Sequence, residues 1–74
     1  ILPGSDGVLN TVEEALEVAE SIGYPVIVKA SAGGGGRGMR IVRSAEDLPG
    51  LYSQARHEAD QAFRCPDVYI EKYI

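Results

Sequence analysis

Four consecutive glycines, Gly33–Gly36, separate two short apolar segments and limit what the middle of this 74-residue chain can form. The preceding segment, Val26–Ala30, is rich in β-branched residues, and the following one, Met39–Arg43, alternates apolar and polar side chains. Both patterns are typical of strands. Because glycines have little strand propensity, the sequence predicts two strands joined by a hairpin-like connection.

The segment before this pair of strands has helical periodicity. Apolar residues recur at three- and four-residue spacing over residues 11–22, where Thr11 and Glu14 form a capping box and Gly23 provides a C-terminal stop. Pro25 prevents the helix from continuing. The first helix is therefore expected to end just before the first strand.

A second helix and a third strand are expected after the glycine run. Ser44 with Asp47 predicts a helix cap, the helix should run to about Phe63, and residues 68–74 have the Tyr- and Ile-rich pattern of a strand. The order of helix, two strands, helix and strand predicts an α+β fold, with two helices packed on one face of a small sheet of about three strands. We expect a single domain over residues 1–74.

Charge and cysteine content argue against several classes of function. The formal net charge of −4 argues against nucleic-acid binding, which needs clustered cations. The single cysteine, Cys65, cannot form an internal disulfide, and no metal-ligand spacing lies near it. No apolar run approaches the roughly 20 residues of a membrane-spanning helix. The sequence therefore predicts no nucleic-acid partner, no membrane partner and no metal site of its own.

The segment between the two predicted strands, residues 31–38 and here called the glycine loop, needs a physical explanation. Each ordered glycine costs roughly 0.5 to 1 kcal/mol relative to alanine. Backbone amides without Cβ atoms can turn together toward an anion, and Lys29 adds a positive charge on the face that also carries Ile27 and Met39. A strand follows the glycines, which excludes a dinucleotide fingerprint, and Lys29 precedes them, whereas a Walker A loop has its lysine after the glycines. The two interpretations are a phosphate-binding loop that is mobile when empty and a flexible surface loop.

The run "GYPVIVKASAGGGGRGMRIVRSAEDL" followed by "VYIEKYI" resembles the biotin carboxylase family, the ATP-grasp component of biotin-dependent carboxylases. The resemblance extends from "LPGSDG" to the last residue and corresponds to the B subdomain, a lid that closes over ATP. It implies that the chain is part of a larger enzyme, which uses MgATP to activate bicarbonate as carboxyphosphate and then carboxylates biotin. The magnesium, bicarbonate and biotin sites would lie outside this segment, which is expected to be inert alone.

The resemblance also assigns roles to individual residues. Lys29 would contact the nucleotide phosphates, and the backbone amides of the loop tip would fold over them. The loop-tip residues concerned are Gly34, Gly35 and Gly36. The adenine pocket would be formed by six residues: Ile27, Met39, Glu71, Lys72, Tyr73 and Ile74. Glu71 would accept a hydrogen bond from the region of the adenine amino group, and the backbones of Lys72 and Ile74 would clamp the base. No residue of the chain is expected to be catalytic.

The implied partners are the remaining subdomains of the carboxylase and, indirectly, its biotin carrier domain. The resemblance implies a cytoplasmic enzyme, or one in the mitochondrial matrix of a eukaryote. Two alternatives stay open. One is the lid of another ATP-grasp ligase, such as a carbamoyl phosphate synthetase or a carboxylating enzyme of purine biosynthesis. The other is a non-catalytic interaction domain whose glycine loop contacts a protein. The acyl-CoA or keto-acid acceptor is left undetermined.

Overall fold

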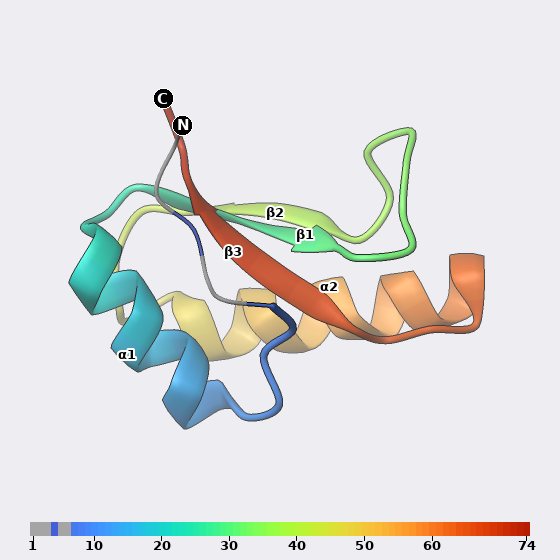
Figure 1. The fold of residues 1–74 in the computed structure, drawn as a ribbon, viewed down its shortest axis with the longest axis horizontal. Coiled ribbons are helices and arrows are strands. Elements are labelled where there is room, and N and C mark those ends of the chain that lie inside the picture. Colours follow the sequence, from blue (N-terminus) through green and yellow to red (C-terminus); the bar gives the residue numbers. More distant parts are fainter. Residues whose placement is uncertain (1–3, 5–6) are drawn as a thin grey trace.

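A computed structural model describes residue 4 and residues 7–74 of the chain. Within them the elements follow in the order α1 (Val12–Ile22), β1 (Val26–Ala30), β2 (Met39–Val42), α2 (Leu48–Phe63) and β3 (Val68–Lys72). The strands form one layer and the helices a second (Figure 1). The predicted α+β fold is therefore confirmed. The "LPGSDG" stretch, apart from its two glycines, lies outside the described residues.

The three strands form a sheet with the order β2-β1-β3, in which both neighbours of β1 are antiparallel to it. Lys29 of β1 is opposite Met39 of β2 and Tyr69 of β3, and Ile27 is opposite Ile41. Residues that are directly opposite each other, or two apart on one strand, lie on the same face of a sheet. The predicted sharing of one face by Ile27, Lys29 and Met39 is therefore confirmed.

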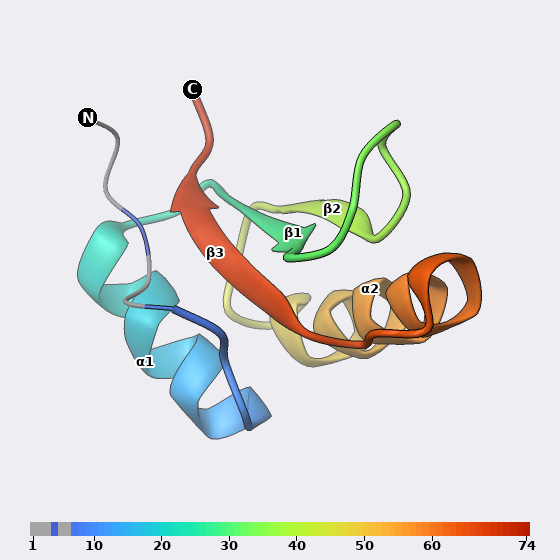
Figure 2. The ribbon, with the colours of Figure 1, turned by 45° about the vertical axis from the view of Figure 1, so that its right-hand side comes forward.

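Both helices cover the other face of the sheet, as predicted (Figure 2). That face is mostly apolar and closed, since its apolar strand side chains are buried against the helices, whereas Arg40 and Lys72 on the same face are only partly buried. The core formed there consists of Leu9, Ala15, Ala19, Val26, Val28, Val42, Leu48, Tyr52, Ala55, Val68 and Ile70. The opposite face, which carries Lys29, is left without a helix. The fold thus has a closed side and an open side, and the glycine loop projects from the end of the β1–β2 pair.

The ends of α1 follow the predicted signals. The Thr11 side chain accepts a hydrogen bond from the Glu14 amide at 3.1 Å, and the Glu14 carboxylate accepts one from the Asn10 amide at 3.1 Å. Gly23 ends the helix with φ of 90°. Lys72 Nζ then donates to the Gly23 carbonyl at 2.9 Å and to the next carbonyl at 3.1 Å, so the third strand ties down the end of the first helix.

The start of α2 departs from the predicted cap. Asp47 occupies the cap position, but its side chain makes no capping hydrogen bond. Its backbone is already helical, with φ of −86° and ψ of −15°, whereas a capping side chain normally needs an extended backbone to reach the free amides. The Asp47 carboxylate instead accepts a hydrogen bond from Ser44 Oγ at 3.2 Å. Pro49 lies in the first turn, where its missing N–H is tolerated.

Two strands are shorter than predicted. β2 ends at Val42 instead of Arg43, and β3 ends at Lys72 instead of Ile74. Both of these terminal residues lie opposite Val26, the first residue of β1. Pro25 precedes Val26, and its carbonyl still accepts a hydrogen bond from the Tyr73 amide at 3.1 Å. Because Pro25 has no N–H to donate in return, the ladder between β1 and β3 does not continue past this point. Among the described residues, neither helix is long and apolar enough to cross a membrane.

Candidate functional site

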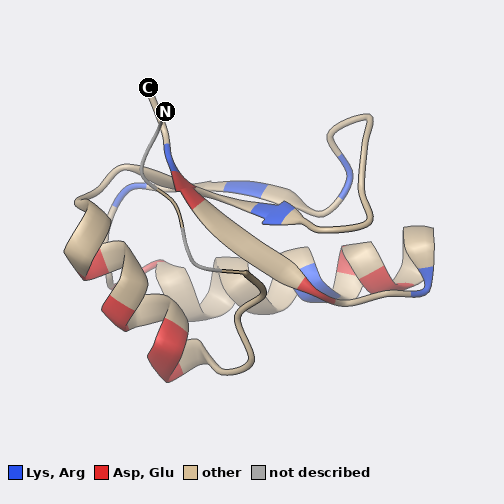
Figure 3. Ribbon diagram, in the orientation of Figure 1, with Lys and Arg blue, Asp and Glu red and all other residues tan. Residues whose placement is uncertain are grey.

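A pocket of about 270 Å³ lies between the glycine loop and the open face of the sheet. It is lined by Lys29, Ala30, Gly33, Gly34, Gly35, Gly36, Arg37, Met39 and Tyr69. The charged side chains among these are cations. Figure 3 shows basic residues on β1, β2 and the glycine loop, whereas α1 carries acidic residues only. The pocket is therefore suited to an anion.

Lys29 reaches the pocket from the second-last position of β1. Its Nζ lies 2.8 Å from Oε1 of Glu71, and the two side chains are 36% and 32% exposed. The hydrogen bond with Glu71 and the nearby charge of that carboxylate raise the pKa of Lys29 above its ordinary value, although partial burial acts in the opposite direction. Lys29 is therefore firmly protonated at neutral pH, and it is already paired with a carboxylate.

Two glycines at the base of the glycine loop are required by packing. A Cβ at Gly33 would lie 2.8 Å from Ala30 Cβ and 3.0 Å from Phe63 Cε2. A Cβ at Gly38 would lie 2.7 Å from Ala30 Cβ and 3.1 Å from Ala59 Cβ, and the φ of Gly38 is +70°. No other residue type fits these two positions without movement of the core beneath them.

The glycines at the tip of the loop are different. A Cβ at Gly34 or Gly35 would meet nothing within 4 Å, and one at Gly36 would meet only Met39 Cε at 3.8 Å. Gly35 and Gly36 have φ of +68° and +80°, which favours glycine at both positions. Gly34 has neither a close neighbour nor a positive φ. The fold itself therefore gives no reason for a glycine at position 34, and its backbone is open to a ligand.

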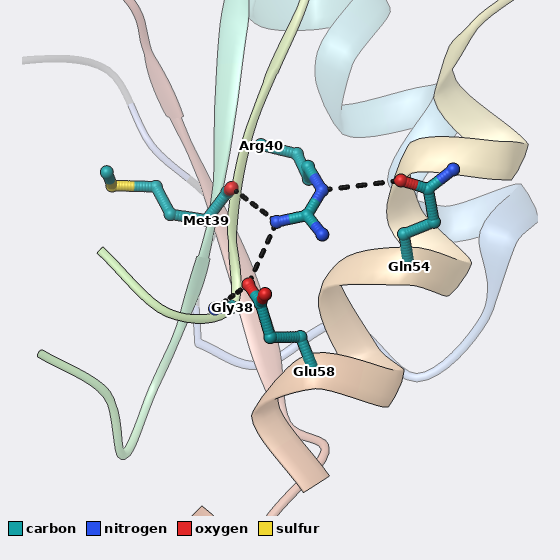
Figure 4. Close-up of polar contacts among 5 residues, drawn as sticks. All are labelled: Gly38, Met39, Arg40, Gln54 and Glu58. Atoms are coloured by element: carbon teal, nitrogen blue, oxygen red, sulfur yellow. Dashed lines mark hydrogen bonds and ion pairs between the residues drawn. The ribbon is translucent and has the colours of Figure 1, made fainter. Parts of the chain in front are cut away.

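A polar cluster on the helix side holds the loop base (Figure 4). Oε1 of Glu58, on α2, accepts hydrogen bonds from the Gly38 amide at 2.6 Å and from Arg40 Nη1 at 2.9 Å. Arg40 also donates to the Met39 carbonyl at 2.9 Å and to Gln54 at 3.4 Å. The hydrogen bonds from Arg40 and Gly38, with the charge of the arginine, lower the pKa of Glu58.

Sequence reasoning did not identify Glu58, although one signal for it was present. Arg40 alternates with Ile41 and so shares the face of Val42, which is fully buried against the helices. An arginine on such a face needs an acidic partner from the helix that covers it. The guanidinium of Arg37 lies 5.2 Å from the centre of the Phe63 ring, and the residue also lines the pocket.

The other predicted site residues fall into two groups. Ile27 and Glu71 lie on the open face with Lys29 and Met39, next to the pocket but outside its lining. Lys72, Tyr73 and Ile74 lie at the far end of β3. The Lys72 side chain binds the end of α1, the Tyr73 amide donates to the Pro25 carbonyl at 3.1 Å, and Ile74 is 86% exposed. Tyr69, which sequence reasoning did not single out, lines the pocket.

Comparison with known proteins places these features in a family. The family model described as "Carbamoyl-phosphate synthase L chain, ATP binding domain" matches residues 1–74. The chain is 58% identical over 73 residues to the 2-oxoglutarate carboxylase small subunit of Hydrogenobacter thermophilus, which corresponds to 99% of this chain and 16% of that relative. The chain thus spans about one sixth of the length of this relative.

Solved structures agree with the sequence comparison. The fold superposes with a TM-score of 0.97 on biotin carboxylase from Campylobacter jejuni, described as a β-γ-ATP complex, at 54% identity over 100% of this chain and 17% of that one. It superposes with a TM-score of 0.95 on the biotin carboxylase domain of H. thermophilus 2-oxoglutarate carboxylase, described with MgADP, ADP and bicarbonate. That match has 57% identity over 99% of this chain and 16% of the other.

The relatives also correct one expectation about the cellular compartment. Relatives from Populus trichocarpa and Arabidopsis thaliana are named as chloroplastic biotin carboxylases. The mitochondrial matrix is therefore wrong as a general location for eukaryotic members.

The family model matches the chain over its whole length, and the carboxylases compared above are its relatives. The chain therefore belongs to the carbamoyl-phosphate synthase L chain ATP-binding domain family and, within it, to the ATP-grasp biotin carboxylases.

Proposed function

We propose that this chain is the ATP-binding lid of a biotin carboxylase. The observation that carries the proposal is the pocket between the glycine loop and Lys29, which has cationic side chains and an open backbone at Gly34. Two structural relatives are described as complexes with a β-γ-ATP ligand and with MgADP and bicarbonate. In this proposal the chain is one lobe of a larger enzyme, and the other subdomains are its partners.

The phosphates of ATP would lie in this pocket, beneath the glycine loop. Lys29 would exchange its carboxylate partner Glu71 for phosphate oxygens, and the backbone amides of Gly34, Gly35 and Gly36 would donate to the same group. A phosphate has more oxygens and more charge than one carboxylate, so the exchange is favourable. The magnesium that accompanies ATP would supply further charge neutralisation, but the charged groups lining this pocket are cations and do not suit the ion. We therefore expect its ligands on other subdomains.

The adenine ring would lie farther along the open face. Met39 provides an apolar surface there, since it is 40% exposed, whereas Ile27 on the same face is only 7% exposed and would contribute a small area. Glu71 would accept from the adenine amino group once Lys29 has turned to the phosphates. The backbones of Lys72 and Ile74, with the ring of Tyr73, would complete the pocket where β3 leaves the sheet.

The contribution of the lid to catalysis would be electrostatic and positional. Loop closure would offset phosphate charge and exclude the water that hydrolyses carboxyphosphate before its carboxyl group reaches biotin. Proton transfer would be performed elsewhere in the enzyme. The biotin carrier domain would meet this lobe only through the assembled active site, and we expect the enzyme in the cytoplasm of a bacterial source.

Binding of MgATP to the full-length protein tests this function. Lys29→Gln should weaken binding by roughly 10- to 150-fold, the equivalent of one hydrogen bond to a charged group. Gly34→Ala should weaken binding while leaving stability within about 1 kcal/mol, because the new methyl meets only ligand. The matched control is Arg43→Gln, which removes one positive charge from an exposed residue outside the pocket. Unchanged affinity in both test variants would refute the proposal.

The family description also names carbamoyl-phosphate synthase, so a lid of that enzyme is the second candidate. Both enzymes would use the same pocket for ATP. Biotin separates them, because only a biotin carboxylase should cleave ATP faster when free biotin is added with bicarbonate. Stimulation by an ammonia donor instead of biotin would favour the second candidate.

A further inference from the structure

The two ends of the glycine loop are anchored in different ways. The β1–β2 ladder stops at the pair Lys29 and Met39, so the loop residues beyond it have no partner in that ladder. At the first end, the Ser31 amide donates to the Asp67 carbonyl at 2.9 Å. At the second end, the Gly38 amide donates to the Glu58 carboxylate at 2.6 Å. The first anchor is backbone only, whereas the second depends on one side chain.

We propose that Glu58 is a positioning residue for the nucleotide, acting through Gly38 and Arg40. The inference rests on the proposed function, in which the glycine loop covers the phosphates. Gly38 is buried, so without Glu58 its N–H would lose the acceptor seen in the structure. Glu58 therefore fixes the direction in which the chain leaves β2 toward the loop tip.

Arg40 makes this anchor compatible with a phosphate site. An unpaired carboxylate beside an anion pocket would repel the ligand. Arg40 donates to the same Glu58 oxygen and also to Gln54, one turn nearer the start of α2. Gln54 is four residues from Glu58 and so lies on the same helix face. The Glu58 charge is offset within the cluster, and the helix, the strand and the loop base are held together.

The expected consequence of losing Glu58 is a loop that must be ordered by the ligand. Binding would then have to supply the ordering free energy that the anchor supplies in advance. Glu58 touches neither the pocket nor the proposed position of the phosphates. Its loss should therefore act on the affinity for MgATP more than on the rate of the bound complex.

The experiment uses the full-length protein and compares Glu58→Ala and Glu58→Gln with Glu17→Ala, which removes the same charge from an exposed position on α1. Amide hydrogen exchange of Gly38 and the loop is measured without nucleotide, and KM and kcat for MgATP are measured below all melting temperatures. Glu58→Ala should speed the exchange and raise KM at least about tenfold, with a smaller change in kcat. Glu58→Gln keeps an oxygen for the Gly38 amide and should recover part of the loss.

The outcomes separate this inference from the proposed function. Faster exchange with unchanged KM would show a merely structural role and overturn the inference. Unchanged exchange in both Glu58 variants would overturn the anchor itself. A wild-type protein that does not bind MgATP would refute the proposed function, and the positioning role with it. If Glu58→Ala does not fold, Glu58→Gln alone tests the positioning role. A KM for MgATP equal to that of Glu17→Ala would then contradict a contribution from the Glu58 charge and its pairing with Arg40.

Discussion

Replacement of Gly38 by alanine tests whether packing fixes the base of the glycine loop. The φ of +70° would place alanine in the left-handed region, at a cost of about 1 to 2 kcal/mol. The new Cβ would also lie 2.7 Å from Ala30 Cβ and 3.1 Å from Ala59 Cβ. Neither methyl can rotate away from it, because a Cβ is fixed by its backbone. Extra carbon in a packed site costs about 1 to 3 kcal/mol more.

The sum, about 2 to 5 kcal/mol, is a large part of the stability of a unit of this size, since roughly 0.05 to 0.15 kcal/mol per residue is typical. Gly35→Ala is the matched control. Its φ of +68° carries the same backbone cost, but its Cβ would meet nothing within 4 Å. Gly35→Ala should therefore destabilise by about 1 to 2 kcal/mol only.

Urea unfolding of the wild type and the two variants measures these differences, provided that the slopes of the transitions agree. The difference between Gly38→Ala and Gly35→Ala isolates the packing contribution because the backbone cost cancels. Equal destabilisation by the two substitutions would refute the packing argument. It would show that the loop base can move away from Ala30 and Ala59 at little cost.

Three further predictions concern charge and activity. The pKa of Glu58 is lowered in the folded protein, so the stabilisation by its carboxylate is complete above the ordinary glutamate pKa and is lost as the pH falls through the lowered value. The difference in unfolding free energy between wild type and Glu58→Gln should therefore shrink on acidification in that window. A difference independent of pH would contradict this. Glu71→Gln should lower the pKa of Lys29, seen by NMR of its Nζ-bearing carbon, and an unchanged titration would show that the pair is absent in solution. The 74-residue chain alone should show no bicarbonate-dependent ATP cleavage, and measurable cleavage would disprove a purely supporting role.

The fold could be predicted well from local signals. The segment Val26–Ala30 is short, β-branched and bounded by Pro25 and by glycines, so few structures other than a strand were compatible with it. The capping box at Thr11 and Glu14 formed as expected because both partners are close in sequence. The predicted cap of Ser44 with Asp47 was wrong, because Asp47 itself occupies the cap position with a helical backbone and its side chain makes no capping hydrogen bond.

The candidate site was predicted less completely. Lys29 and the face it shares with Met39 follow from strand alternation, and the glycine loop follows from composition. The sequence does not show which glycines of the loop are required by packing and which are open. That difference depends on contacts such as the one with Ala59, from a helix that follows much later in the chain. The Lys29–Glu71 pair likewise joins residues 42 positions apart and requires the register of β1 against β3. Such contacts are set by tertiary packing, which periodicity does not encode.

The close approach of the loop base to Ala30 and Ala59 also restricts how the sequence can drift. Two glycines already have the smallest possible side chain, so a larger residue at either alanine cannot be compensated from the loop. Substitution at these alanines should therefore be rejected even in a relative that has lost its ligand, since the restriction comes from the fold. Gly34 at the loop tip has no such neighbour, so a relative that no longer binds nucleotide could have almost any residue at this position.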